Sequence, residues 1–148
     1  GYNYKDPDAE NIMPIIEQVA YGKQESLTIF GDDYNTRDGT CIRDYIELED
    51  LVHAHILALK TEQSDTINLG TGKGTTVLEL VRRYEQEHGI KIPHTIGKRR
   101  SGDPACIIAS YDKAKRILGW EPKFHDIEGV IETAWKWFND NRSKINYE

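Results

Sequence analysis

The stretch from residue 26 to residue 51 is the part of this sequence that most constrains its fold. It begins with a short apolar run, Leu27–Phe30, which predicts a strand, and this run leads into a loop of turn-forming residues over 31–39. A second predicted strand covers residues 44–48, and the acidic pair that follows opens a predicted helix over 49–60. Short strands and helices that follow one another in this way indicate a mixed α/β fold.

The rest of the chain continues this alternation. Asn11 can cap a first helix over residues 12–20, and Gly89 and Gly119 follow later predicted helices as stop signals. The hydrophobic pattern predicts further helices over 77–87, 112–118 and 126–139, and further strands over 66–69, 93–96 and 107–109. We therefore expect a single mixed α/β domain over residues 1–148, with about five helices.

Composition limits the classes of partner. The chain has 148 residues, enough to bury a substantial core, and its formal net charge of -6 repels a polyanion, so we expect no nucleic-acid partner. No apolar run approaches the roughly 20 residues of a membrane helix, so we expect no membrane partner. Cys41 and Cys106 stand far apart without metal or redox spacing, which favours a reducing compartment and a cytoplasmic location.

Aromatic and basic residues around the first loop indicate a site for a nucleotide and its phosphates. Phe30 ends the first predicted strand, and Arg43 and Tyr45 follow the loop. An aromatic ring can pack against a base, and the planar guanidinium group matches the geometry of phosphate oxygens. A second motif, Arg-Arg-Ser-Gly-Asp over residues 99–103, suits a diphosphate, and its Asp103 could accept hydrogen bonds from sugar hydroxyls. Alone this motif is more typical of a solvated turn, but together with Arg43 and Tyr45 it favours binding.

Two further patterns look like cofactor or catalytic motifs, and we interpret both as structural. The glycine-rich segment 70–74 lies between a predicted strand and a helix, but its spacing matches neither a dinucleotide loop nor a P-loop, so we expect a tight connection. Tyr111 and Lys115 have the spacing of a dehydrogenase catalytic pair but begin only a short predicted helix. The histidines are scattered or point apart, so we expect neither a metal site nor a catalytic residue.

These motifs resemble the C-terminal, substrate-binding portion of the UDP-glucose 4-epimerases, which belong to the extended short-chain dehydrogenases/reductases. The resemblance covers nearly the whole chain and is most specific in the loop 33–40 and in Arg43-Asp44-Tyr45. The segments that carry it are the whole block over residues 26–51, Asn11-Ile-Met-Pro14, Gln18-Val-Ala20, Asn68-Leu-Gly-Thr-Gly72, residues 99–103 and Leu118-Gly-Trp120. The resemblance implies a small mixed α/β substrate-binding domain without the Rossmann half of such an enzyme.

The resemblance also implies that UDP-glucose or UDP-galactose is the ligand. The residues that would contact it are Asn11, Ile12, Leu27, Thr28, Phe30, Arg43, Tyr45, Val77, Arg100 and Asp103. By this likeness, Leu27, Thr28 and Phe30 would hold the uracil and Val77 would line the nucleotide side. The diphosphate would lie near the start of the first helix and be bound by Arg43 and Arg100, while Tyr45 and Asp103 would hold phosphate and ribose. Glu47, which stands where the family usually has His, is expected to be a surface change.

The implied reaction depends largely on residues outside this sequence. In the family, bound NAD takes a hydride from sugar C4, and the 4-keto intermediate turns over before the hydride returns to its other face. The NAD loop and the catalytic Tyr/Lys pair belong to an N-terminal Rossmann domain. The sequence opens at Gly1 and has its single methionine at Met13, so we expect a piece of a longer chain. We expect this piece to be inactive alone and to bind no NAD, and the parent to be a homodimer through the missing half.

Two alternatives remain open. The chain could be the same region of another nucleotide-sugar enzyme, such as a dehydratase or a decarboxylase, although those enzymes typically have a shorter loop at residues 33–40. It could also be a binding domain with no catalytic partner.

Overall fold

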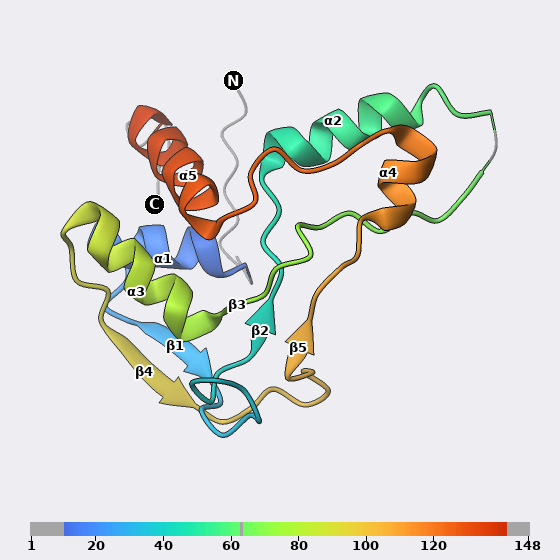
Figure 1. Ribbon diagram of the computed structural model, residues 1–148. Helices are drawn as coiled ribbons and strands as arrows, with labels where there is room; N and C mark the ends of the chain where they lie inside the picture. Colours follow the sequence, from blue (N-terminus) through green and yellow to red (C-terminus); the bar gives the residue numbers. More distant parts are fainter. Residues whose placement is uncertain (1–10, 63, 142–148) are drawn as a thin grey trace.

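The computed structural model describes residues 11–62 and 64–141 and has a mixed α/β architecture, as the sequence predicts (Figure 1). The helices in these ranges are α1 (Ile12–Ala20), α2 (Leu48–Ala58), α3 (Val77–His88), α4 (Asp112–Leu118) and α5 (Ile127–Asn141). The strands are β1 (Leu27–Phe30), β2 (Ile42–Arg43), β3 (Thr75–Thr76), β4 (His94–Gly97) and β5 (Cys106–Ile107). Within the described ranges, no helix combines the length and apolar character needed to cross a membrane.

The strands form two small sheets. β1 and β4 pair in parallel, with Leu27 opposite His94 and Phe30 opposite Gly97. β2 is the middle strand of the second sheet, antiparallel to β3 and parallel to β5. In Figure 1, α1, α3 and α5 gather beside the β1–β4 pair, whereas α2 and α4 lie together at the other end of the molecule.

Each end of the molecule has its own hydrophobic cluster. The larger cluster joins α1, β1, α3 and α5 through buried residues that include Ile16, Ile29, Leu80 and Ile131. The smaller cluster lies between α2 and α4 around Trp120, whose side chain is fully buried and whose indole N–H donates to the Asp50 carbonyl at 2.9 Å. The described residues therefore bury their apolar side chains in two separate places.

Local sequence signals fix the helix ends. Thr76 caps α3 in a capping box with Glu79, and Gly89 and Gly119 end α3 and α4 in the left-handed conformation that glycine adopts without strain. Asn11 occupies the N-cap position of α1 but its side chain makes no capping hydrogen bond. Among the predicted helices, 12–20 and 112–118 are correct at both ends, and the ends of the other three differ by no more than two residues.

Two predicted strands and one surface assignment are wrong. Residues 44–48 form no strand, because the Asp44 side chain accepts backbone hydrogen bonds from other segments and Glu47 caps α2 by accepting from the Glu49 and Asp50 amides. Glu47 is only 5% exposed, so it is a buried cap and not a surface change. Residues 66–69 form no strand either, since none of the described segments pairs with them; Ile67 and Leu69 pack onto the smaller cluster instead.

Candidate functional site

A cavity of about 270 Å³ opens where the starts of α1 and α3 meet β1, the end of β2 and the loop after β4. Its lining contains every residue that the sequence resemblance singles out, namely Asn11, Ile12, Leu27, Thr28, Phe30, Arg43, Tyr45, Val77, Arg100 and Asp103. These residues come from five separate parts of the chain. The fold therefore brings the whole predicted set together in one place.

One side of the cavity is formed by β1, whose last residue, Phe30, contributes an aromatic ring. Along β1, Leu27 and Ile29 are buried in the larger cluster, whereas Thr28 is exposed and Phe30 half-buried. Gly97 lies opposite Phe30, and a Cβ there would stand only 2.9 Å from Cγ2 of Thr28. The Arg100 guanidinium lies 4.1 Å from the centre of the Phe30 ring. A planar ring and an adjacent hydroxyl suit a base, and here a cation lies over one face of the ring.

The other side carries most of the charge. The guanidinium of Arg43 donates to the Pro104 carbonyl at 3.0 Å and forms an ion pair with Asp103. Both side chains remain accessible, at 21% and 24% exposed. With Arg100, the cavity has two guanidinium groups and one carboxylate, so its lining has a net positive charge in a protein of net charge -6. This arrangement favours an anion with several oxygens.

The structure separates the two neighbouring arginines of the 99–103 motif. Nε of Arg99 lies 2.6 Å from Oδ1 of Asp33, and its guanidinium lies 4.1 Å from the centre of the Tyr34 ring. Arg99 therefore holds the loop after β1, and Arg100 alone of the pair lines the cavity. Of the two arginines in the motif, only Arg100 is therefore placed where it could contact a ligand in this cavity.

Tyr45 has a polar group without a partner. Its hydroxyl is buried and makes no hydrogen bond. Burial is the largest cause that raises the pKa of Tyr45 above its ordinary value, so the phenol stays protonated and can donate. Tyr45 also borders a second cavity of about 390 Å³, where Lys73 pairs with Asp126 at 2.8 Å. An unpaired buried donor beside two guanidinium groups is consistent with a ligand that carries acceptor oxygens.

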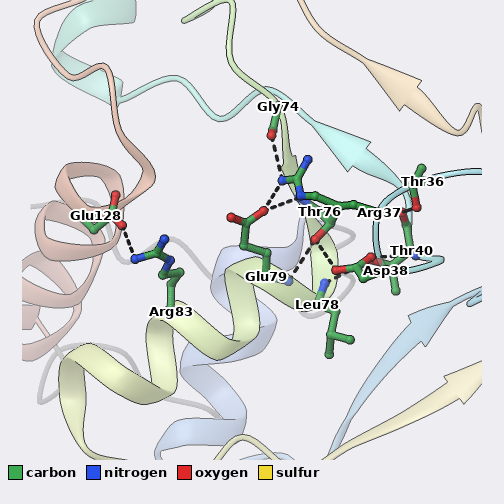
Figure 2. Close-up of polar contacts among 10 residues, drawn as sticks. All are labelled: Thr36, Arg37, Asp38, Thr40, Gly74, Thr76, Leu78, Glu79, Arg83 and Glu128. Carbon is green, nitrogen blue, oxygen red and sulfur yellow. Dashed lines mark hydrogen bonds and ion pairs between the residues drawn. The ribbon is translucent and has the colours of Figure 1, made fainter.

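A network of polar side chains holds the loop between β1 and β2 against the start of α3 (Figure 2). Asp38 accepts from the amide and hydroxyl of Thr40, at 3.0 and 2.8 Å, and from the Thr76 hydroxyl at 2.5 Å. Arg37 donates to the Gly74 carbonyl at 3.0 Å and pairs with Glu79. Burial alone would raise the pKa of Asp38, but the hydrogen bonds from Thr76 and Thr40 lower it overall. These contacts fix the backbone of the loop shortly before Arg43.

The glycine-rich segment 70–74 binds a carboxylate of the protein itself. The amides of Thr71 and Gly72 donate to Asp44, at 3.0 and 3.1 Å. This supports the interpretation of a tight connection, because the amides that could cradle a phosphate are already used. Lys115 pairs with Glu121 at 2.7 Å, and Tyr111 packs edge-on against Trp120, which fits their structural interpretation. Over residues 11–62 and 64–141, no group of three His, Cys, Asp or Glu side chains could hold a metal ion.

Three lining residues were missed at the sequence level: Ile15, Ile29 and Cys41. Cys41 alternates with Arg43 and Tyr45, so a period of two would have indicated that it shares their side. Ile15 lies one helical turn from Ile12 and would have been found by the corresponding helical period. Burial is the largest cause that raises the pKa of the Cys41 thiol, so this lining position is uncharged near neutral pH.

Comparison with known sequences identifies a family. A family model described as GDP-mannose 4,6 dehydratase matches residues 3–133. The UDP-glucose 4-epimerase of Halalkalibacterium halodurans is 50% identical over 135 residues, which are 88% of this chain and 40% of that protein. UDP-glucose 4-epimerase 4 of Oryza sativa subsp. japonica is 46% identical over 148 residues, covering 95% of this chain and 40% of the relative. The chain thus spans about 40% of the length of these curated relatives.

Solved structures agree in fold. The UDP-glucose-4-epimerase of Stenotrophomonas maltophila, with bound NAD and formylated UDP-arabinopyranose, superposes with a TM-score of 0.88 at 41% identity, covering 95% of this chain and 43% of that one. The UDP-glucose 4-epimerase of Bifidobacterium longum, in complex with NAD+ and UDP, gives a TM-score of 0.82 at 36% identity and covers 89% and 40%. These likenesses confirm the expected family and fold.

Proposed function

This chain belongs to the GDP-mannose 4,6 dehydratase family, and we propose that within this family it forms the UDP-sugar-binding part of a UDP-glucose 4-epimerase. The observation that carries the proposal is the convergence of Arg43 and Arg100, 57 positions apart in the sequence, on one cavity beside the Phe30 ring. Curated relatives named as epimerases at 44% to 50% identity support the choice of reaction.

Each wall of the cavity has a role in this proposal. The uracil lies on β1, against Leu27 and Phe30, with the Thr28 hydroxyl as hydrogen-bond partner. The diphosphate lies between Arg43 and Arg100, near the start of α1, and takes the free hydrogen bond of Tyr45. Asp103 exchanges part of its contact with Arg43 for the ribose hydroxyls. Two charge-assisted contacts of this kind contribute about 1.5–3 kcal/mol each.

The proposed whole enzyme interconverts UDP-glucose and UDP-galactose with NAD as cofactor. A dinucleotide loop would be expected at the glycine-rich segment 70–74, which leads to α3. The described residues there do not fit NAD, because the amides of Thr71 and Gly72 already bind Asp44. We therefore assign NAD binding and the catalytic pair to sequence outside this chain. This chain is assigned the binding of the nucleotide.

A further surface supports the proposal that this chain is the substrate half of a larger enzyme. On α2 and its C-cap, the apolar residues Leu48, Val52, Ile56 and Leu59 follow one another at helical spacing and are 68%, 49%, 53% and 87% exposed. The neighbouring segment 66–69 has a strand-like sequence but no pairing partner among the described residues. An exposed apolar stripe of this kind is typical of a surface that packs against another domain. Homodimer formation by the parent through that other domain, and a cytoplasmic location, remain predictions.

Isothermal titration of the chain with UDP tests the proposed function. Arg43→Ala and Arg100→Ala are each expected to weaken UDP binding about tenfold or more, because each removes a charge-assisted contact. Arg82→Ala, which removes the same charge from an exposed position on α3 outside the cavity, is the matched control and should change the affinity less than twofold. Equal, unchanged affinity in all three variants would contradict the proposed site.

The same titration with GDP distinguishes a UDP-glucose 4-epimerase from a GDP-mannose 4,6 dehydratase, the enzyme that the family description names. The whole cavity measures about 270 Å³, so the smaller pyrimidine base leaves more of it for the rest of the nucleotide than a purine does. We expect tighter binding of UDP than of GDP. Tighter binding of GDP would favour the dehydratase alternative.

A further inference from the structure

Asp44 lies between Arg43 and Tyr45 in the sequence, but it does not line the cavity that they share. Its carboxylate is directed to other parts of the backbone. Oδ1 accepts from the amide and hydroxyl of Thr71, at 3.0 and 2.6 Å, and Oδ2 accepts from the amides of Gly72 and Ala109, at 3.1 and 3.2 Å. One side chain thus joins three segments that are distant in the sequence.

These segments flank the strands of the sheet that holds Arg43. Thr71 and Gly72 precede β3, Ala109 follows β5, and β2 lies between these two strands. A carboxylate only accepts hydrogen bonds, so both its oxygens match the donors around it, whereas an amide side chain would direct an N–H group at some of them. Charge-assisted bonds of this type are among the stronger ones in proteins.

The backbone nearby is shaped around this carboxylate. A Cβ on Gly70 would lie 2.5 Å from Oδ2 of Asp44 and 2.7 Å from the Cβ of Ala109. A residue larger than glycine would therefore force Asp44 or the segment after β5 to move. Gly74 allows a similarly close approach, since a Cβ there would stand 2.4 Å from Cγ2 of Ile42 in β2.

We propose that Asp44 is a positioning residue for the nucleotide site: by tying the end of β2 to the segments at 71–72 and 109, it fixes the backbone from which Arg43 and Tyr45 project into the cavity. The inference rests on the proposed function. Side chains of successive residues in an extended segment point to opposite sides, so anchoring Asp44 on one side orients its two neighbours on the other. The base slot depends on β1, which pairs with β4 and makes no bond to Asp44.

This difference between the two halves of the site provides the test. Asp44→Asn keeps the size of the side chain but replaces one acceptor oxygen by a donor. UDP should bind about tenfold more weakly to this variant, whereas uridine, which lacks phosphates, should change less than twofold. Asp65→Asn makes the same chemical change at an exposed ion pair with Lys113 and should leave both affinities unchanged. Calorimetry for UDP and an NMR titration for uridine supply the two numbers.

A milder pair of variants guards against misfolding of Asp44→Asn. Thr71→Val removes the hydroxyl bond to Asp44 and Thr71→Ser retains it, and Thr71 is outside the lining of the nucleotide cavity. We expect a loss of UDP affinity of about threefold for Thr71→Val and none for Thr71→Ser, again without change for uridine.

The possible results have distinct meanings. Equal losses for UDP and uridine would mean that Asp44 only stabilises the fold, and would overturn the inference. Unchanged UDP affinity in both Asp44→Asn and Thr71→Val would overturn it as well, while leaving the proposed function intact. Failure of the unsubstituted chain to bind UDP at all would overturn the proposed function, and the inference with it.

Discussion

At the scale of single residues, the charge of the cavity depends on which groups each arginine side chain contacts. Arg99 and Arg100 are adjacent, yet Arg99 holds Asp33 and the Tyr34 ring while Arg100 lies over Phe30 in the cavity. Arg43 combines an ion pair to Asp103 with a hydrogen bond to the Pro104 carbonyl, so its guanidinium is fixed before any ligand arrives. Preorganised donors of this kind favour binding because less side-chain freedom is lost on association.

The planar fork of Arg43 is therefore expected to matter beyond its charge. Arg43→Lys keeps the charge but cannot contact Asp103, the Pro104 carbonyl and a phosphate together. We expect the Kd for UDP to rise about fivefold to tenfold, as measured by calorimetry. An affinity equal to that of the unsubstituted chain would show that charge alone is sufficient.

Glu17 makes stability dependent on pH. It is 5% exposed inside the larger cluster, where burial raises its pKa from 4.5 to about 8, partly offset by a hydrogen bond from the Tyr84 hydroxyl at 3.3 Å. The folded chain holds this proton at pH values where the unfolded chain has lost it, so stability is highest below about pH 4.5 for this group and falls as the pH rises to about 8.

Glu17→Gln should remove that dependence. Glutamine keeps an acceptor for Tyr84 but has no proton to lose, so the variant should gain stability over the unsubstituted chain as the pH rises from 5 to 8, by about 3 kcal/mol. Urea unfolding at pH 5, 6, 7 and 8 measures this difference. A difference that stays constant over these four values would contradict a raised pKa at Glu17.

At the scale of secondary-structure elements, the sequence predicts what local signals determine. The capping box of Thr76 and Glu79 and the left-handed Gly119 depend on near neighbours, and the corresponding helices were found with correct or nearly correct ends. The strand predicted at 66–69 fails because a strand needs a neighbour, which local sequence does not reveal. Most of the residues that line the cavity were named through the family resemblance, whereas Cys41 was missed because the resemblance gives it no ligand contact.

Thr76 links an element to the site. Its hydroxyl accepts from the Glu79 amide at 3.1 Å and donates to Asp38 at 2.5 Å, so it both caps α3 and holds the loop before β2 (Figure 2). Thr76→Ala should lower the free energy of unfolding by about 1–2 kcal/mol, and Thr76→Ser, which retains the hydroxyl, by less than half of that. Chemical denaturation of the two variants decides; equal losses would assign the effect to the methyl group and not to the cap.

At the scale of the whole molecule, the cavity and the exposed apolar stripe of α2 lie on different elements of the described residues. Residues of α1, α3, β1 and β2 line the cavity, whereas the exposed apolar residues belong to α2 and its C-cap. Figure 1 shows α2 beside α4 and apart from α3 and β1. The two features are thus separate, and the stripe is available to a second domain without blocking the cavity. This arrangement accords with a chain that spans about 40% of its relatives' length.

The chain alone is expected to give no turnover of UDP-galactose to UDP-glucose, because the catalytic pair and the NAD loop are assigned to sequence beyond it. A coupled assay with NAD added, run beside a complete relative as positive control, checks this. If the chain alone gave turnover above the background measured without protein, the assignment of catalysis to sequence outside the chain would be wrong.

A crystal structure of the chain with UDP tests the central claim most directly. We predict electron density for uracil on the Phe30 ring and for the diphosphate within about 3.2 Å of nitrogen atoms of both Arg43 and Arg100. Density for UDP elsewhere on the molecule, with the two guanidinium groups free of phosphate, would contradict the account.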